Sequence, residues 1–385
     1  MIPYGKQSIS DEDIEAVLQV LKSDFLTQGE EVPKFEKDLC EYVGVDYGVA
    51  VNSGTSALHI ACLSLGLSKD DYLWTSPVSF VASSNCALYC GAKVDFIDIE
   101  LNTGNIDISA LRKKLKTAKK ENSLPKIIIP VHLSGLPCDM AEIYELSEKY
   151  GFKIIEDASH AIGGKYEDSM IGNCKYSDIT IFSFHPVKNM TTAEGGMAVT
   201  NKKSYFEKME ILRTHGITRN PSMMTHSPDG PWYYQQIELG FNYRLSDVHA
   251  ALGRNQLKRL DKSIQCRHRI AKYYDKQLAN LPYILPARQK NKFSGMHLYI
   301  IKVDKAKTGK TRDEIFSFMR NAGIGVNIHY IPIHTQPYYQ ALGFSLGDFP
   351  NAELFYDQII SIPIYPDLTK VQQDYVVETL MKAAL

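Results

Sequence analysis

The first two hundred residues alternate short apolar runs with helical patterns, and this alternation limits the fold more than any other feature. The runs expected to form strands are residues 48–51, 72–75, 93–99, 126–132, 153–157 and 179–184. Helical patterns lie between several of them, for example at residues 106–115 and 141–150. Strands that alternate with helices favour a largely parallel sheet covered by helices, with ligand groups at the strand ends. The sequence therefore predicts an α/β fold.

The pattern changes after residue 250. A long helical stretch runs to about residue 280, and two further strands are expected at residues 296–303 and 325–328. A helix with Thr311 as its N-cap lies between these strands. A chain of 385 residues is long enough for two domains. We expect a large domain over residues 1–250 and a smaller C-terminal α+β domain over residues 251–385.

Charge and composition exclude several classes of function. The formal net charge is −1, which gives no electrostatic case for binding nucleic acid or a membrane surface. No apolar run approaches the length of a membrane span, and the N-terminus lacks the pattern of a secretory signal. Seven cysteines without a CxxC pair favour a reduced cytoplasmic protein. The eleven histidines show no metal-ligand spacing, so no metal site is expected.

Residues 178–200 carry the main chemical feature: an apolar strand, a polar loop that contains Lys188, and a second apolar strand. A lysine held between buried strands can have a lowered pKa, and its neutral amine can then form a Schiff base with a carbonyl. Pyridoxal phosphate is the usual aldehyde, and its pyridine nitrogen needs a carboxylate partner. Asp157, at the end of an upstream strand, supplies one. The alternative is a surface lysine that follows a core strand.

Other candidate groups also follow predicted strands. The helix expected to begin near Thr55 offers free N–H groups to an anion such as a phosphate, with Ser56 beside it. An ordinary capped strand-to-helix turn would have the same sequence. Phe80 could stack on a planar cofactor ring or belong to the core. Because Thr55, Phe80, Asp157, Ser183 and Lys188 all come after strands, we expect one site at one edge of the sheet.

Three segments resemble the signature of the DegT/DnrJ/EryC1 family of nucleotide-sugar aminotransferases. They are EDASHA at residues 156–161, FSFHPVK at residues 182–188 and EGG at residues 194–196. The similarity extends over nearly the whole chain, from about Pro3 to Pro366. Enzymes of this family have the fold-type-I architecture and depend on pyridoxal 5′-phosphate. Dehydratase members have a histidine in place of the lysine, so Lys188 implies transamination.

The resemblance also implies roles for individual residues. Lys188 and Asp157 would be catalytic, and the segment at residues 240–247 would cross the interface of a homodimer with shared active sites. The implied cofactor contacts are Thr55 and Ser56 at the phosphate, Phe80 on the ring, and His160, Ser183 and Asn242. The implied substrate contacts are Thr27, His185, Arg244, His329, Tyr330 and His334. Taken without the resemblance, these histidines could equally be structural, and residues 330–339 could be an aromatic loop packed on the core.

A finer resemblance concerns residues 185–196 and 329–338, which are similar to the aminotransferases of pseudaminic acid biosynthesis. It implies amination at C4 of a UDP-linked 4-keto-6-deoxy-N-acetylhexosamine, UDP-2-acetamido-2,6-dideoxy-β-L-arabino-hex-4-ulose, with L-glutamate as amino donor. One alternative is another UDP-, GDP- or dTDP-4-keto sugar. A second is a non-enzymatic regulatory protein on the same fold, against which the intact Lys188, Asp157 and Ser183 argue.

Overall fold

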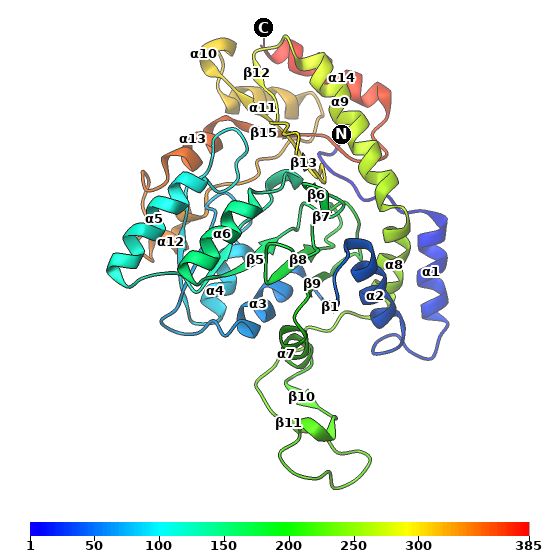
Figure 1. Cartoon of the computed structure of the whole chain (residues 1–385). Helices are drawn as coiled ribbons and strands as arrows, with labels where there is room; N and C mark the ends of the chain where they lie inside the picture. Colours follow the sequence, from blue (N-terminus) through cyan, green and yellow to red (C-terminus); the bar gives the residue numbers. More distant parts are fainter. Residues whose placement is uncertain (385) are drawn as a thin grey trace.

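The computed structural model describes residues 1–384 and is built around a seven-stranded sheet (Figure 1). The strand order is β1-β9-β8-β5-β4-β2-β3. Only β9 runs antiparallel to its neighbours β1 and β8, and the other pairings are parallel. The largely parallel sheet expected from the sequence is therefore confirmed. The strands are β1 (Tyr47–Val51), β2 (Tyr72–Thr75), β3 (Lys93–Phe96), β4 (Ile127–Ile129), β5 (Lys153–Asp157), β8 (Ile179–Ser183) and β9 (Gly196–Thr200).

Helices cover both faces of this sheet, which explains why its strands are continuously apolar. Successive strand residues point to opposite faces, so Ile128 lies in one core while Ile127 and Ile129 lie in the other. The first core includes residues of α2 (Glu31–Val43), α5 (Ile108–Glu121), α6 (Met140–Tyr150) and α8 (Asp247–Lys258). The second includes residues of α3 (Gly54–Ser64), α4 (Ala82–Tyr89) and α7 (Lys203–Arg213).

The N-terminal helices are held at their first turns by side-chain caps. Helix α1 (Asp11–Leu21) begins with a capping box between Ser10 and Asp13. The buried carboxylate of Asp247, in the first turn of α8, accepts hydrogen bonds from the N–H groups of Gly29, Glu31 and Val32 at the start of α2. This carboxylate therefore satisfies N–H groups that α2 cannot pair within itself. Helices α1, α2 and α8 lie together on one side of the body (Figure 1).

A third core lies beyond α9 (Leu260–Leu278). Its sheet contains β12 (Tyr283–Ile284), β14 (Tyr299–Val303) and β15 (Ile359–Ile362), all antiparallel, packed with α9, α11 (Arg312–Asn321) and α14 (Lys370–Ala384). Thr311 caps α11 as expected. The strand expected at residues 325–328 is wrong, because the Gly325 N–H bonds the carbonyl of Ile2 and only Asn327 forms a bridge to this sheet. Ile333 and Phe349 come late in the chain but pack in the second core of the main sheet. The expected division into two domains at residue 250 therefore stays a prediction.

The remaining elements are short. Strands β6 (Lys165–Tyr166), β7 (Ser169–Met170) and β13 (Lys292–Phe293) form a small sheet. The arm, defined here as residues 214–243, contains the pair β10 (Ile217–Thr218) and β11 (Gln235–Gln236) and extends away from the body (Figure 1). The short helices of the C-terminal part are α10 (Lys305–Thr308), α12 (Pro337–Gln340) and α13 (Pro350–Gln358). Among residues 1–384 there is no helix with the length and apolar character that crossing a bilayer requires.

Candidate active site

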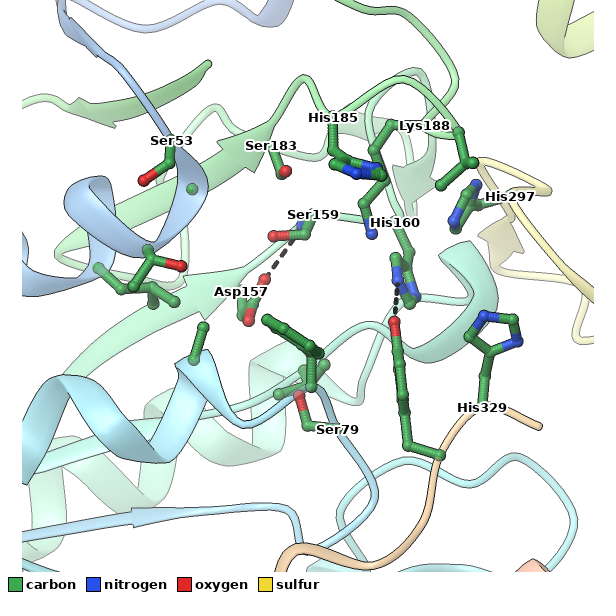
Figure 2. A pocket seen from close by; sticks show the side chains of 18 of the residues that line it. Ser53, Ser79, Asp157, Ser159, His160, Ser183, His185, Lys188, His297 and His329 are labelled. Atoms are coloured by element: carbon green, nitrogen blue, oxygen red, sulfur yellow. Dashed lines mark hydrogen bonds between the residues drawn. The ribbon is translucent and has the colours of Figure 1, made fainter. Parts of the chain in front are cut away.

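A cavity of about 480 Å³ opens at the carboxyl ends of the central strands (Figure 2). Asp157 is the last residue of β5, Ser183 is the last residue of β8, and the loop after β1 leads into α3. Because parallel strands end at the same edge of a sheet, these groups meet there. The five residues that were expected to share one site all line this cavity: Thr55, Phe80, Asp157, Ser183 and Lys188.

The carboxylate of Asp157 is held by neighbours in its own chain. It is 5% exposed, and its two oxygens accept hydrogen bonds from the Ser83 hydroxyl at 2.6 Å and from the Ser159 N–H at 3.1 Å. Ser83 is fully buried, and its oxygen lies 2.7 Å from that of Ser79, which lines the cavity. These bonds fix the orientation of the carboxylate and leave it lone pairs for a ligand. Ser83 was not identified from the sequence.

Lys188 lies in the loop between β8 and β9, with its side chain in the cavity (Figure 2). Burial lowers the pKa of this amine to about 8, against the opposing attraction of the Asp157 carboxylate. About a tenth of the amine is therefore neutral at pH 7, far more than for an ordinary lysine. The loop ends at Gly196, which packs directly against the backbone of Ser53. A side chain at this position would not fit, since a Cβ on Gly196 would lie 2.5 Å from the Ser53 carbonyl carbon.

The start of α3 forms another part of the wall. Ser53 is the N-cap and accepts the Ser56 N–H at 3.0 Å, whereas the N–H groups of Gly54 and Thr55 have no acceptor within residues 1–384. Free N–H groups at the positive end of a helix attract an anion. The helix starts one residue earlier than expected. The Ser56 hydroxyl donates to Asn52 at 2.6 Å and does not line the cavity, so its expected contact with a phosphate stays a prediction.

Imidazoles and a phenol form the wall nearest the C-terminal part of the chain. The rings of His160 and His297 are 4.5 Å apart, and His329 Nδ1 lies 2.8 Å from the Ser361 hydroxyl. Burial lowers the pKa of all three histidines, so these imidazoles are neutral. Burial raises the pKa of Tyr330, whose hydroxyl lies within hydrogen-bonding distance of His160 Nε2, at 3.0 Å.

Several cavity residues were missed by the sequence reasoning. His297 comes just before β14, in a segment without a recognisable motif, and only the packing of the two cores brings it to His160. Tyr4 and Asn327 line the same wall. Ser53 could have been found, because serine is a preferred N-cap residue and Ser53 lies just before the point where the helix was expected to begin. His185 lies in the cavity as expected, with an exposed side chain.

Four other candidates lie outside the cavity of this chain. His334 is fully buried, pairs with Glu353 at 2.9 Å and packs against Phe349, so it is a core residue here. Thr27 is exposed. The backbone of residues 242–244 lies beside the end of β1. The Asn52 N–H donates to the carbonyl of Tyr243, which lies between Asn242 and Arg244, and Val51 forms a β-bridge with Arg244. Their side chains do not line the cavity.

The arrangement combines an amine, a carboxylate and an anion-binding helix end around one space, which suits a planar phosphorylated aldehyde. The described part of the chain contains no group of three or more His, Cys, Asp or Glu side chains that could hold a metal ion.

Comparison with known proteins agrees with this geometry. The UDP-4-amino-4,6-dideoxy-N-acetyl-beta-L-altrosamine transaminase of Campylobacter jejuni is 40% identical over 99% of this chain and 96% of its own length. Helicobacter pylori PseC, an aminotransferase of pseudaminic acid biosynthesis, superposes with a TM-score of 0.89 at 32% identity, covering 99% of this chain and 98% of its own. The PMP form of Streptococcus pneumoniae Spr1654 gives 0.90 at 28% identity, covering 100% and 99%. The DegT/DnrJ/EryC1/StrS aminotransferase family model matches residues 7–381. The chain therefore belongs to this aminotransferase family, whose cofactor is pyridoxal 5′-phosphate.

Proposed function

We propose that this enzyme transfers the amino group of L-glutamate to C4 of UDP-2-acetamido-2,6-dideoxy-β-L-arabino-hex-4-ulose, in pseudaminic acid biosynthesis. The observation that carries the proposal is the 40% identity, over nearly the full length, to the Campylobacter jejuni transaminase. The proposal includes a homodimer with shared active sites. It also includes a cytoplasmic location, in keeping with an odd set of scattered cysteines.

The cavity residues fit the three reactive parts of pyridoxal 5′-phosphate. The free N–H groups of Gly54 and Thr55 suit its phosphate, the Asp157 carboxylate suits its pyridine nitrogen, and the Lys188 amine suits its aldehyde. Phe80, 58% exposed at the cavity, would cover the ring. When bound, this cofactor supplies an electron sink for the carbanion that transamination requires.

In this proposal Lys188 and Asp157 divide the chemistry. The Asp157 carboxylate, oriented by Ser83, keeps a proton on the pyridine nitrogen. The Lys188 Nζ takes the α-proton from the amino donor as a general base and returns a proton as a general acid. A pKa of about 8 serves both directions, because the amine is partly protonated and partly neutral at cellular pH. The same two roles in reverse place nitrogen on the keto sugar.

The neutral imidazole wall is the proposed sugar-binding side. His329 and Tyr330 offer hydrogen-bonding groups to hydroxyl or acetamido groups, and His185 lines the same cavity. His160, which Tyr330 contacts, is proposed to lie beside the cofactor ring. Thr27, Asn242 and Arg244 are proposed to act in the cavity of the partner subunit, because their side chains do not line their own. His334 has no proposed role at the site.

A substrate panel tests this function. We expect turnover with L-glutamate and the L-arabino UDP sugar, and much lower kcat/KM with its D-xylo epimer, a UDP-4-keto-pentose and GDP-4-keto-6-deoxymannose. A site built to bond particular polar groups rejects analogues that lack them by about 10⁴–10⁵-fold. Conversion of the cofactor by glutamate alone is the control, since it needs no sugar. A preference for the GDP- or pentose-linked sugar would contradict the pathway but leave the aminotransferase assignment standing.

A further inference from the structure

A second cavity, of about 220 Å³, lies on another side of the Lys188 loop. Its walls come from that loop, from the N-terminal residues 6–8 and from the beginning of α9. Five of its lining residues are basic: Lys6, Lys188, Arg259, Lys262 and Arg267. Asp367 is the only acidic residue among the described residues that line it. Because Lys188 extends its side chain into the active-site cavity, the other four basic residues supply the positive charge here, although the whole chain is close to neutral.

Arg267 is the unusual member of this set. Its side chain is 1% exposed, and one terminal nitrogen donates to the carbonyls of His297 at 3.1 Å and Ile364 at 2.9 Å. Its Nε has no hydrogen-bond partner, and no carboxylate among residues 1–384 lies within ion-pairing distance of it. Burial lowers the pKa of the guanidinium only to about 10, so it remains charged at neutral pH. A buried cation without a counter-charge is costly, and such groups are normally paired.

The other cations increase this imbalance. Arg259 pairs with Asp13, yet its buried Nε is also without a partner. Lys6 and Lys262 are exposed at the edge of the cavity and form no ion pair within the described chain. Exposed lysines alone would be ordinary solvated side chains. Beside a buried and unpaired guanidinium they provide the second and third charges that hold a small anion.

We propose that this cavity binds a small oxyanion, with carboxylate or phosphate oxygens held by Arg267, Lys262 and Lys6. Its volume suits a free inorganic anion or a short dicarboxylate rather than a nucleotide sugar. The bound anion would also connect to the active site, since Arg267 holds the carbonyl of His297, whose ring contacts His160. This binding site does not depend on which sugar the enzyme aminates.

Calorimetric titration of the cofactor-loaded protein tests the site, with inorganic phosphate and glutarate as separate probes. Loading with cofactor keeps the added phosphate away from the helix α3 site. We expect saturable binding of at least one probe, weakened about tenfold by Lys262→Met or Lys6→Met, because each removes one charged contact. Lys272→Met is the matched control: it is exposed on the same helix, lies outside the cavity, and should bind as the wild type does.

The two probes also separate the two sources of such an anion. Binding of phosphate alone supports a free inorganic ligand, whereas binding of glutarate that the same lysine variants weaken supports a dicarboxylate. Absence of saturable binding for both probes overturns the proposal. So does binding that both lysine variants leave unchanged. Arg267→Met should abolish binding, and if its melting curve indicates misfolding, the two lysine variants still decide the result.

Discussion

The sheet-edge wall of the active-site cavity, formed by Asp157, Ser183 and Lys188, differs from the arm in what surrounds its side chains. In the wall, Asp157 is held by Ser83 and by a backbone N–H of the same chain. In the arm, Trp232 is 72% exposed and Leu239 is 78% exposed, and Asn242 is exposed at its end. The wall is thus completed by one chain, whereas the arm presents large apolar and polar side chains that this chain does not cover. The chemistry is therefore expected to come from one chain, and a part of the substrate contact from its partner.

The largest expected effect comes from the wall. Lys188→Ala should reduce turnover by about 10⁴-fold, because it removes the group that moves the proton. Cofactor should still bind, since the N–H groups at the start of α3 remain. Activity and cofactor content are measured on the same preparation. The exposed Lys175→Ala is the matched control and should retain full activity.

Chemical labelling tests the same assignment independently of activity. Borohydride reduction of the loaded wild-type enzyme, followed by peptide mapping, should place the pyridoxyl label on Lys188. A label on any other lysine refutes this role, whatever the activity of the variant.

The next effect concerns Arg244, the residue that directly follows the arm, and its absence would contradict the comparison. We expect Arg244→Ala to be inactive, because Arg244 is proposed to complete the cavity of the partner subunit. Mixing it with Lys188→Ala chains should restore about a quarter of wild-type activity, since half of the dimers are mixed and each has one intact site. The rate is measured after subunit exchange, with mixed dimers quantified by differently tagged chains. Mixed dimers that form and stay inactive would show that each chain completes its own site.

The sequence predicted the sheet and the wall well, for a physical reason. Buried parallel strands are continuously apolar, so residues 126–132 and 179–184 stood out, and the groups after them were expected to meet at one edge. The C-terminal part was harder to predict. The strand expected at residues 325–328 has β-branched residues, but its first N–H bonds Ile2, more than three hundred residues away in the sequence. A local pattern carries no information about such a partner.

The same limit explains the errors at the site. His334 and His297 look alike in the sequence, since each is a histidine close to apolar residues. Folding places His334 against Glu353 in a core and His297 against His160 at the cavity. Ser56 differs for a local reason, because its hydroxyl bonds Asn52 four residues before it and does not line the cavity. The roles of the arm residues remain predictions, since they depend on a second chain.

The smallest expected effect sharpens the comparison by testing how the wall holds its carboxylate. Ser83→Ala removes the hydroxyl that donates to Asp157 at 2.6 Å. The position is fully buried, so the substitution changes this contact inside the protein and not at its surface. Losing one hydrogen bond to a charged group should weaken cofactor binding about tenfold. The absorbance of the loaded enzyme should also change its dependence on pH, because the carboxylate controls the pyridine proton. Ser84→Ala is the matched control, since that buried neighbour bonds the Val81 carbonyl and the Tyr339 hydroxyl and does not touch Asp157. Equal losses in both variants would mean that the effect comes from packing of helix α4, and that the wall orients Asp157 without Ser83.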